Sequence, residues 1–199
     1  DDTIDNTGET DATDVIQALL DKAGNEGGGI VYLPGGHYRI DGNLTVPTNV
    51  ELKGAVDVGR VPYNTGTVFE VYGGKGEAEG TPTVTLKEKS GIRGIVFDYP
   101  EQHPHKDTSE IIAYPYAIKG DGKDIYIVNI STRNGYNGID LLSSRCDNHY
   151  VEYLAGICVN NAIRVGGGSN GGLVNNFQMN YNAMLGGATT GWGVWENFP

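Results

Sequence analysis

Apolar residues occur along most of this chain in short runs that are separated by Gly, Pro, Asn or Asp. In the N-terminal part the runs fall at 30–33, 38–40, 44–46 and 50–53. Such short runs, bounded by turn residues, are typical of strands in an all-β protein. The pattern therefore predicts many short strands joined by tight turns.

Residues 11–23 are the exception, because their apolar side chains recur at helical spacing. Asp11 or Asp14 is expected to cap the start of this helix, and Gly24 to end it. We expect the helix to cover the first coil of the fold, where an open sheet edge would invite pairing with another chain.

The second half of the chain contains an internal repeat of strand-like segments. Segments 127–130, 151–154 and 174–177 align, with first residues 24 and 23 positions apart. A second set is centred on residues 118, 139 and 163, which are 21 and 24 positions apart. Residues 92–95 fit an earlier coil that carries an insertion of about ten residues.

This period indicates a solenoid, and we predict a right-handed parallel β-helix with an N-terminal capping helix. Leucine-rich repeats have a similar period, but their Leu pattern is missing here. Residues 1–199 are expected to form one domain, the N-terminal part of a longer β-helix. Ile118, Ile139 and Ile163 should stack inward, while Asn129 and Asn176 share a turn column that Tyr153 interrupts.

Side chains alternate along a strand, so Lys119, Asp140 and Arg164 are expected to point outward on successive coils. This column could hold a polysaccharide along the helix axis. Lys119 and Arg164 would bind the substrate, and Asp140 would be catalytic. The alternative is a solvated ladder of ion pairs, which contributes little to stability.

Aromatic residues supply further candidates for sugar binding. Tyr126 and Tyr150 are 24 positions apart and should stack, as a sugar platform or as a packing ladder. Trp192 is a third candidate for stacking on a sugar ring. His103, His105 and Asp107 could bind a metal, but their spacing matches no metal signature and favours a solvated loop.

Three segments resemble the opening of the pectate-lyase-like superfamily: 10–18 (TDATDVIQA), 27–38 (GGGIVYLPGGHY) and 44–54 (LTVPTNVELKG). They occur in the family's order. The resemblance implies a parallel β-helix, and a protein that acts on or binds polysaccharides. It does not choose a reaction, since hydrolases, lyases and phage tailspikes share this opening.

Among these reactions we favour glycoside hydrolysis, with a uronan lyase as the second choice. A non-catalytic glycan-binding or tailspike-like β-helix is the rival from another class. Residues 136–140 resemble the NTDGID motif of polygalacturonase-like hydrolases, but Asn137 stands at the catalytic Asp. Asp147 and Glu152 are candidates for a second carboxylate. No cofactor is expected for hydrolysis, whereas a lyase could hold calcium beside Asp140.

Composition narrows the partners further. The net charge of -11 argues against nucleic acid, and no apolar run is long enough to span a bilayer. The start of the chain looks trimmed, so we expect a secreted protein. Cys146 and Cys158 form a disulfide or remain two free thiols. Residues 196–199 do not resemble a cap, so a further segment or chain is expected to complete that end.

Overall fold

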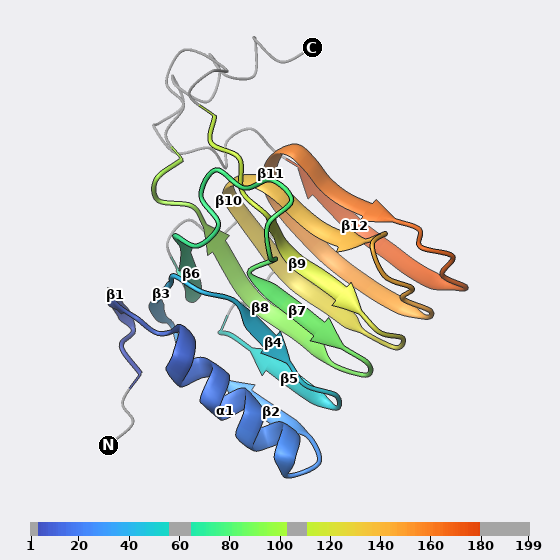
Figure 1. Cartoon of the computed structure of the whole chain (residues 1–199), viewed down its shortest axis with the longest axis horizontal. Helices are drawn as coiled ribbons and strands as arrows, with labels where there is room; N and C mark the ends of the chain where they lie inside the picture. Colours follow the sequence, from blue (N-terminus) through green and yellow to red (C-terminus); the bar gives the residue numbers. More distant parts are fainter. Residues whose placement is uncertain (1–3, 56–64, 103–110, 180–199) are drawn as a thin grey trace.

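The structure is a computed structural model that describes residues 4–55, 65–102 and 111–179. In these ranges the chain forms one helix and a 12-stranded parallel sheet that curls into coils (Figure 1). The elements are β1 (Thr7–Asp11), α1 (Thr13–Asn25), β2 (Gly29–Tyr32), β3 (Gly36–Ile40), β4 (Leu44–Val46), β5 (Val50–Lys53), β6 (Thr67–Val71), β7 (Val84–Lys87), β8 (Gly91–Asp98), β9 (Tyr116–Asp121), β10 (Tyr126–Leu141), β11 (His149–Val165) and β12 (Gly172–Met179).

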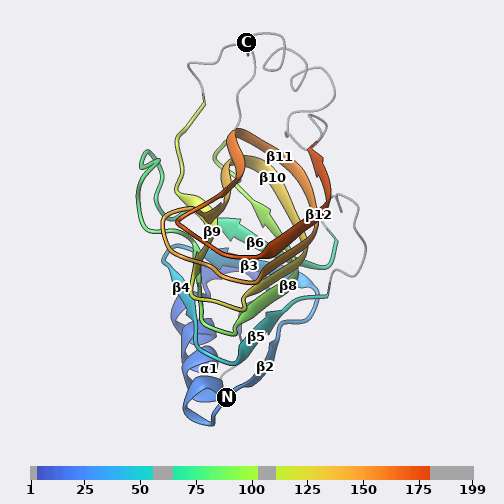
Figure 2. The ribbon, with the colours of Figure 1, turned by 90° about the vertical axis from the view of Figure 1, so that its right-hand side faces the viewer.

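The strands stack into three faces, which the longest strands join by bending around corners (Figure 2). Face I contains β2, β5 and the first parts of β8, β10, β11 and β12. Face II contains β1, β3, β6 and the following parts of those long strands. Face III contains β4, β7, β9 and the last parts of β10 and β11. The predicted parallel β-helix is confirmed.

The strand register follows the repeat found in the sequence. On face I, Ile127 pairs with Ile92 on one side and with Val151 on the other. On face III, Ile139 pairs with Ile118 and Ile163. Ile118 and Ile139 are buried in the core, and Ile163 packs against it. Both predicted sets of strands, and the insertion before residue 126, are confirmed.

The corner between faces I and II turns through one residue in the left-handed region. Asn129, Tyr153 and Asn176 have φ angles of 54°, 58° and 51°, and Gly94 has 71°. Gly adopts this region freely because it has no Cβ, and Asn adopts it at low cost because its short side chain bonds the nearby backbone, whereas Tyr has neither advantage. The predicted turn column of Asn129 and Asn176, with Tyr153 between them, is confirmed.

The helix α1 lies at one end of the stack and covers the first coil (Figure 1). Its Ile16 and Leu20 are buried in the core. Two details of the prediction were wrong. The residue at the N-cap is Ala12, while Asp11 accepts bonds from the backbone N–H and hydroxyl of Thr13. The helix also continues through Gly24 to Asn25.

Both cysteines are free thiols, so the disulfide alternative is excluded. Cys158 lies within 3.5 Å of the hydroxyl of Thr132, and burial raises the pKa of its thiol to about 12. Burial also raises the pKa of Cys146. Both thiols are therefore protonated at neutral pH. The part of the chain that the structure describes contains no helix that could span a bilayer.

Candidate functional site on face III

The predicted column of charged residues exists on face III. Asp140 on β10 pairs with Lys119 on β9 and with Arg164 on β11. Because Ile139 points into the core, the next side chain on the strand points away from it. The repeat thus places one carboxylate between two cations on adjacent coils.

Asp140 is almost completely enclosed, with 3% of its surface exposed. Arg164 donates to it through two atoms, from Nε to Oδ1 at 2.9 Å and from Nη2 to Oδ2 at 3.0 Å. The backbone N–H groups of Leu142 and Ser143 also donate to Oδ1, at 2.9 and 3.0 Å. These bonds to a buried anion satisfy its oxygens within the protein.

The protonation state of Asp140 follows from this environment. Burial by itself raises the pKa of a carboxyl group, but the bonds from Arg164, Ser143 and Leu142 outweigh it. The pKa of Asp140 is therefore far below its usual range. Asp140 stays ionised at neutral pH, which makes it a poor proton donor and a weak base.

Arg164 is held on several sides. Its guanidinium group lies 4.3 Å from the ring centre of Tyr116, and its Nη2 also donates to the hydroxyl of Ser143 at 2.9 Å. The carboxylate of Asp140 raises the pKa of Arg164. Burial raises the pKa of Tyr116, and the charge of Arg164 opposes this rise. The guanidinium is thus fixed in position beside the opening of the site.

A pocket of about 120 Å³ lies over this column. One wall consists of strand residues, and the other is the loop between β6 and β7, which contributes the exposed carboxylate of Glu79. The lining residues are Ala78, Glu79, Gly80, Pro82, Tyr116, Lys119, Asp140, Ser143 and Arg164. Glu79 carries no motif, and only the path of the loop brings it to the pocket.

Hydrogen bonds hold the loop between β6 and β7 against the adjacent coil. The N–H of Gly76 donates to the carbonyl of Ala113 at 2.8 Å. The N–H of Thr83 donates to the backbone carbonyl of Tyr116 at 3.0 Å. Asn43 donates from Nδ2 to the carbonyls of Thr81 and Pro82, each at 3.0 Å. The loop is therefore a structured wall of the pocket.

Tyr126 and Tyr150 pair with each other, as predicted, but on face I. Neither lines the face III pocket. The ring of Tyr126 lies over Gly91, and its hydroxyl donates to Glu51. Tyr150 is 42% exposed. The structure thus separates the two tyrosines from the charged column. Trp192 lies outside the described residues, as do the three candidate metal ligands at 103–107.

The candidates for a second carboxylate are not in the pocket either. Asp147 accepts bonds from Arg145 and from the backbone N–H of Asn170, so it is a turn residue. Glu152 lies on face I, where it accepts a bond from Asn176. Over the described ranges, the structure contains no cluster of three or more metal-binding side chains of the His, Cys, Asp or Glu type.

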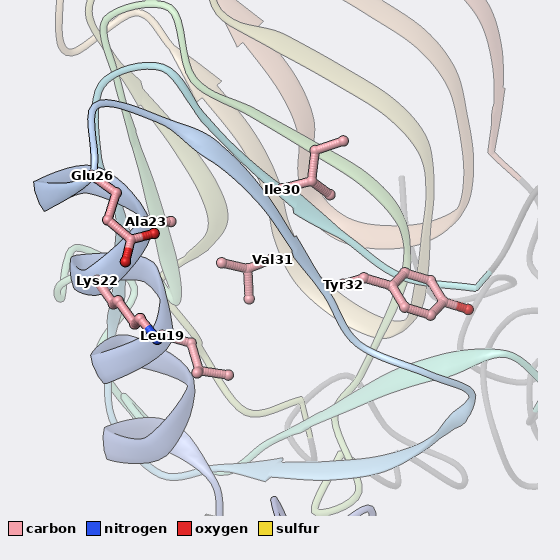
Figure 3. Close-up of a pocket in the computed structure, with 7 residues that line it drawn as sticks. All are labelled: Leu19, Lys22, Ala23, Glu26, Ile30, Val31 and Tyr32. Atoms are coloured by element: carbon pink, nitrogen blue, oxygen red, sulfur yellow. The ribbon is translucent and has the colours of Figure 1, made fainter.

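A larger hollow of about 270 Å³ lies between α1 and β2. Figure 3 shows Val31 directed toward the helix, while Ile30 and Tyr32 extend away from it. The charged residues that line this hollow are Lys22, on the last turn of α1, and Glu26, just beyond its end. Most of its lining is apolar, and it lies at the capping end of the fold. The pocket on face III, with its fixed cations and carboxylates, is the stronger candidate site.

Comparison with known proteins places the chain in a family. The family model for rhamnogalacturonase A/epimerase, pectate lyase-like proteins matches residues 1–197. The chain belongs to this family. Its fold is also found in a Parabacteroides merdae protein whose assignment as a glycosyl hydrolase is provisional. That match has a TM-score of 0.63 and 20% identity, and covers 94% of this chain and 87% of the other.

Relatives from Azotobacter vinelandii, among them a lyase and an epimerase, match in sequence. Alginate lyase 7 is 28% identical over 198 residues, which cover 70% of this chain and 22% of that protein. Mannuronan C5-epimerase AlgE1 is 39% identical over 95 residues, covering 40% of this chain and 7% of that protein. The chain thus spans about a fifth or less of the length of these relatives. The family acts on polysaccharides, through more than one reaction type.

Proposed function

We propose that this chain belongs to an enzyme that modifies a uronate-containing polysaccharide by removing the proton at C5. Elimination and epimerisation both begin with this step. The observation that carries the proposal is the pair of cations, Lys119 and Arg164, on either side of an ionised and enclosed Asp140. Their arrangement suits a substrate that carries a carboxylate.

The role of the cations follows from the chemistry of the sugar. C5 of a uronate is bonded to the carboxylate carbon, so loss of its proton places negative charge on the carboxylate oxygens. A cation that binds those oxygens stabilises this charge as it develops. Lys119 and Arg164 line the pocket, and the bonds to Asp140 orient the Arg164 guanidinium without using its Nη1. Asp140 thus acts as a positioning residue.

Glu79 is the group we assign as the base. It is exposed in the pocket, whereas both oxygens of Asp140 already accept hydrogen bonds. A base must reach the proton that it removes, and the accessible carboxylate meets this condition. Hydrolysis, which we favoured from the sequence, needs a carboxylic acid to protonate the leaving oxygen. The depressed pKa of Asp140 makes it unsuitable for that role.

The relatives support the same class of substrate. An alginate lyase and a mannuronan C5-epimerase both act, by their names, on polymers of uronate residues. The sequence similarity to them spans most or a large part of this chain. We propose a polymer of the alginate type as the substrate, and a secreted protein that meets this polymer outside the cell.

The test is to incubate the full chain with polymannuronate in D₂O and to measure three products. Absorbance of unsaturated ends reports elimination, deuterium at C5 in unbroken chains reports epimerisation, and reducing ends report any chain cleavage. We expect deuterium or unsaturated ends with the natural chain, and at least a ten-fold lower rate with Glu79→Gln.

Two results would contradict the proposal. Reducing ends without unsaturated ends would mean hydrolysis. Binding of the polymer without any of the three products would mean a glycan-binding module. Glu77→Gln is the matched control, because it makes the same change in the same loop at a position that does not line the pocket.

A further inference from the structure

Asn137 is a buried amide at the base of the pocket wall, with 1% of its surface exposed. Its Nδ2 donates to the carbonyl of Tyr114 at 3.0 Å and to that of Ala78 at 3.3 Å. Its Oδ1 accepts a bond from Nδ2 of Asn160, on the next coil, at 2.8 Å. Donor and acceptor atoms of one side chain therefore join three segments.

Two of these segments form the walls of the pocket. Ala78 directly precedes Glu79 in the loop between β6 and β7. Tyr114 is two residues before Tyr116, whose ring supports Arg164. The amide of Asn137 thus connects the wall that carries a carboxylate to the wall that carries the guanidinium.

Only an amide satisfies this environment. Two carbonyl oxygens face Nδ2 and require a donor, while Asn160 supplies the donor that Oδ1 accepts. An ionised carboxylate at this position would face both carbonyl oxygens with no hydrogen to donate. Asn137 stands where the motif of polygalacturonase-like hydrolases carries a catalytic Asp, and its contacts in this chain suit the amide.

We infer that Asn137 is a positioning residue that sets the separation between Glu79 and the Tyr116–Arg164 pair. This inference rests on the proposed function, in which Glu79 removes the proton and Arg164 binds the uronate. If the link is broken, other bonds still hold the ends of the loop at Gly76 and at residues 81–83, so the part that shifts is Ala78 and Glu79 between them. Arg164 remains held by Asp140, so substrate binding changes less than turnover.

The experiment compares the full chain with its Asn137→Asp variant on polymannuronate between pH 5 and pH 8. We expect kcat to fall at least ten-fold at pH 8, with KM changed by less than about three-fold. The new carboxyl group is buried against two carbonyl oxygens, so its pKa is raised. As pH falls it becomes protonated and donates one bond. The ratio of variant to natural kcat should therefore recover partly toward pH 5.

Asn148→Asp is the matched control. Asn148 also bridges two coils, since its Nδ2 donates to Asp124 at 3.0 Å, but it lies at an exposed corner that does not line the pocket. Its kcat should match that of the natural chain across the pH range. A second variant, Asn160→Ala, removes only the bond to Oδ1 and should lower kcat by two- to five-fold. If Asn137→Asp does not fold, the kcat of Asn160→Ala is the test of the inference.

Two results would overturn the inference. One is that Asn137→Asp and Asn160→Ala both keep the natural kcat. The other is that the kcat of Asn137→Asp, relative to the natural chain, does not recover between pH 8 and pH 5. Inactivity of the natural chain on every uronan would instead contradict the proposed function. Amide hydrogen exchange then decides the inference separately. Faster exchange at 76–80 in Asn137→Asp than in Asn148→Asp supports it, and equal exchange overturns it.

Discussion

Faces I and III each carry a column of outward side chains in register, and among the described residues the column on face III lines a pocket with the loop between β6 and β7. On face I, Tyr126 and Tyr150 are partners in the strand register, and Nε of Arg93 lies 3.6 Å from Oε1 of Glu51. On face III, Arg164 makes two bonds to an enclosed Asp140. The repeat generates both columns in the same way. The difference arises from the loop between β6 and β7, which lies over face III.

On face III a loop from another coil covers the charged column, and this makes it the stronger candidate site. The Arg93–Glu51 pair is partly exposed to solvent, with side-chain exposures of 36% and 12%. Asp140 is shielded, so removing its partner Arg164 should destabilise the fold more than removing Arg93. This contrast can be tested at equivalent positions on the two faces.

The largest effect is expected for Arg164→Ala. It leaves the Asp140 carboxylate buried without its cation, and the free energy of unfolding should fall by about 3 kcal/mol. Activity should be lost as well. Arg93→Ala on face I should cost less than about 1 kcal/mol, because its pair is solvated. Urea unfolding measures both, and equal losses would show that the faces do not differ.

Gly91→Ala and Gly138→Ala compare the packing of the two faces. A Cβ at Gly91 would lie 2.1 Å from the Tyr126 ring, and one at Gly138 would lie 2.2 Å from the carbonyl of Ala162. Each change should cost about 2 kcal/mol. In a Tyr126→Ala background, Gly91→Ala should lower the free energy of unfolding much less, because the ring that the new Cβ would meet is gone.

Unfolding measurements on the double variant decide this prediction. Strictly additive losses for Gly91→Ala and Tyr126→Ala would contradict it. The cost at Gly138 cannot be relieved by shortening a side chain, because the obstacle there is backbone.

The third effect is the dependence of stability on pH. The folded pKa of Asp140 is depressed, so its contribution is complete above the unfolded pKa of about 3.9 and is lost as pH falls below it. Asp140→Asn should therefore lose at least about 1 kcal/mol at pH 7, and less at pH 3. Unfolding at several pH values measures the difference from the natural chain. A constant difference would mean that Asp140 is not held as an anion.

The smallest effect on stability is expected for Lys119→Ala and Tyr150→Ala, each within about 0.5 kcal/mol. Their effects on activity should differ. Lys119→Ala should lower kcat/KM by about ten-fold, because one cation of the pocket is lost. Tyr150→Ala should leave kcat/KM unchanged on short oligomers, since Tyr150 lies on face I. A loss with Tyr150→Ala would place substrate on both faces.

Much of the fold could be predicted because the repeat is local information. A period near 23 residues sets which residues stack, and alternation along a strand sets which of them point outward. This is why the Ile118–Ile139–Ile163 column and the Lys119–Asp140–Arg164 column were both found. The capping helix was predicted from its apolar spacing, with errors only at its ends.

The other features of the candidate site depend on contacts between distant parts of the chain. Asn137 reaches Ala78 across 59 positions, and no periodic pattern marks that contact or the arrival of Glu79. The separation of Tyr126 and Tyr150 from the charged column also needed the corners of the coil. Which side chains share a column is therefore readable from the spacing of the repeat. Which column is covered depends on the path of a loop through space and on the charges that burial keeps from solvent, so it requires the folded chain.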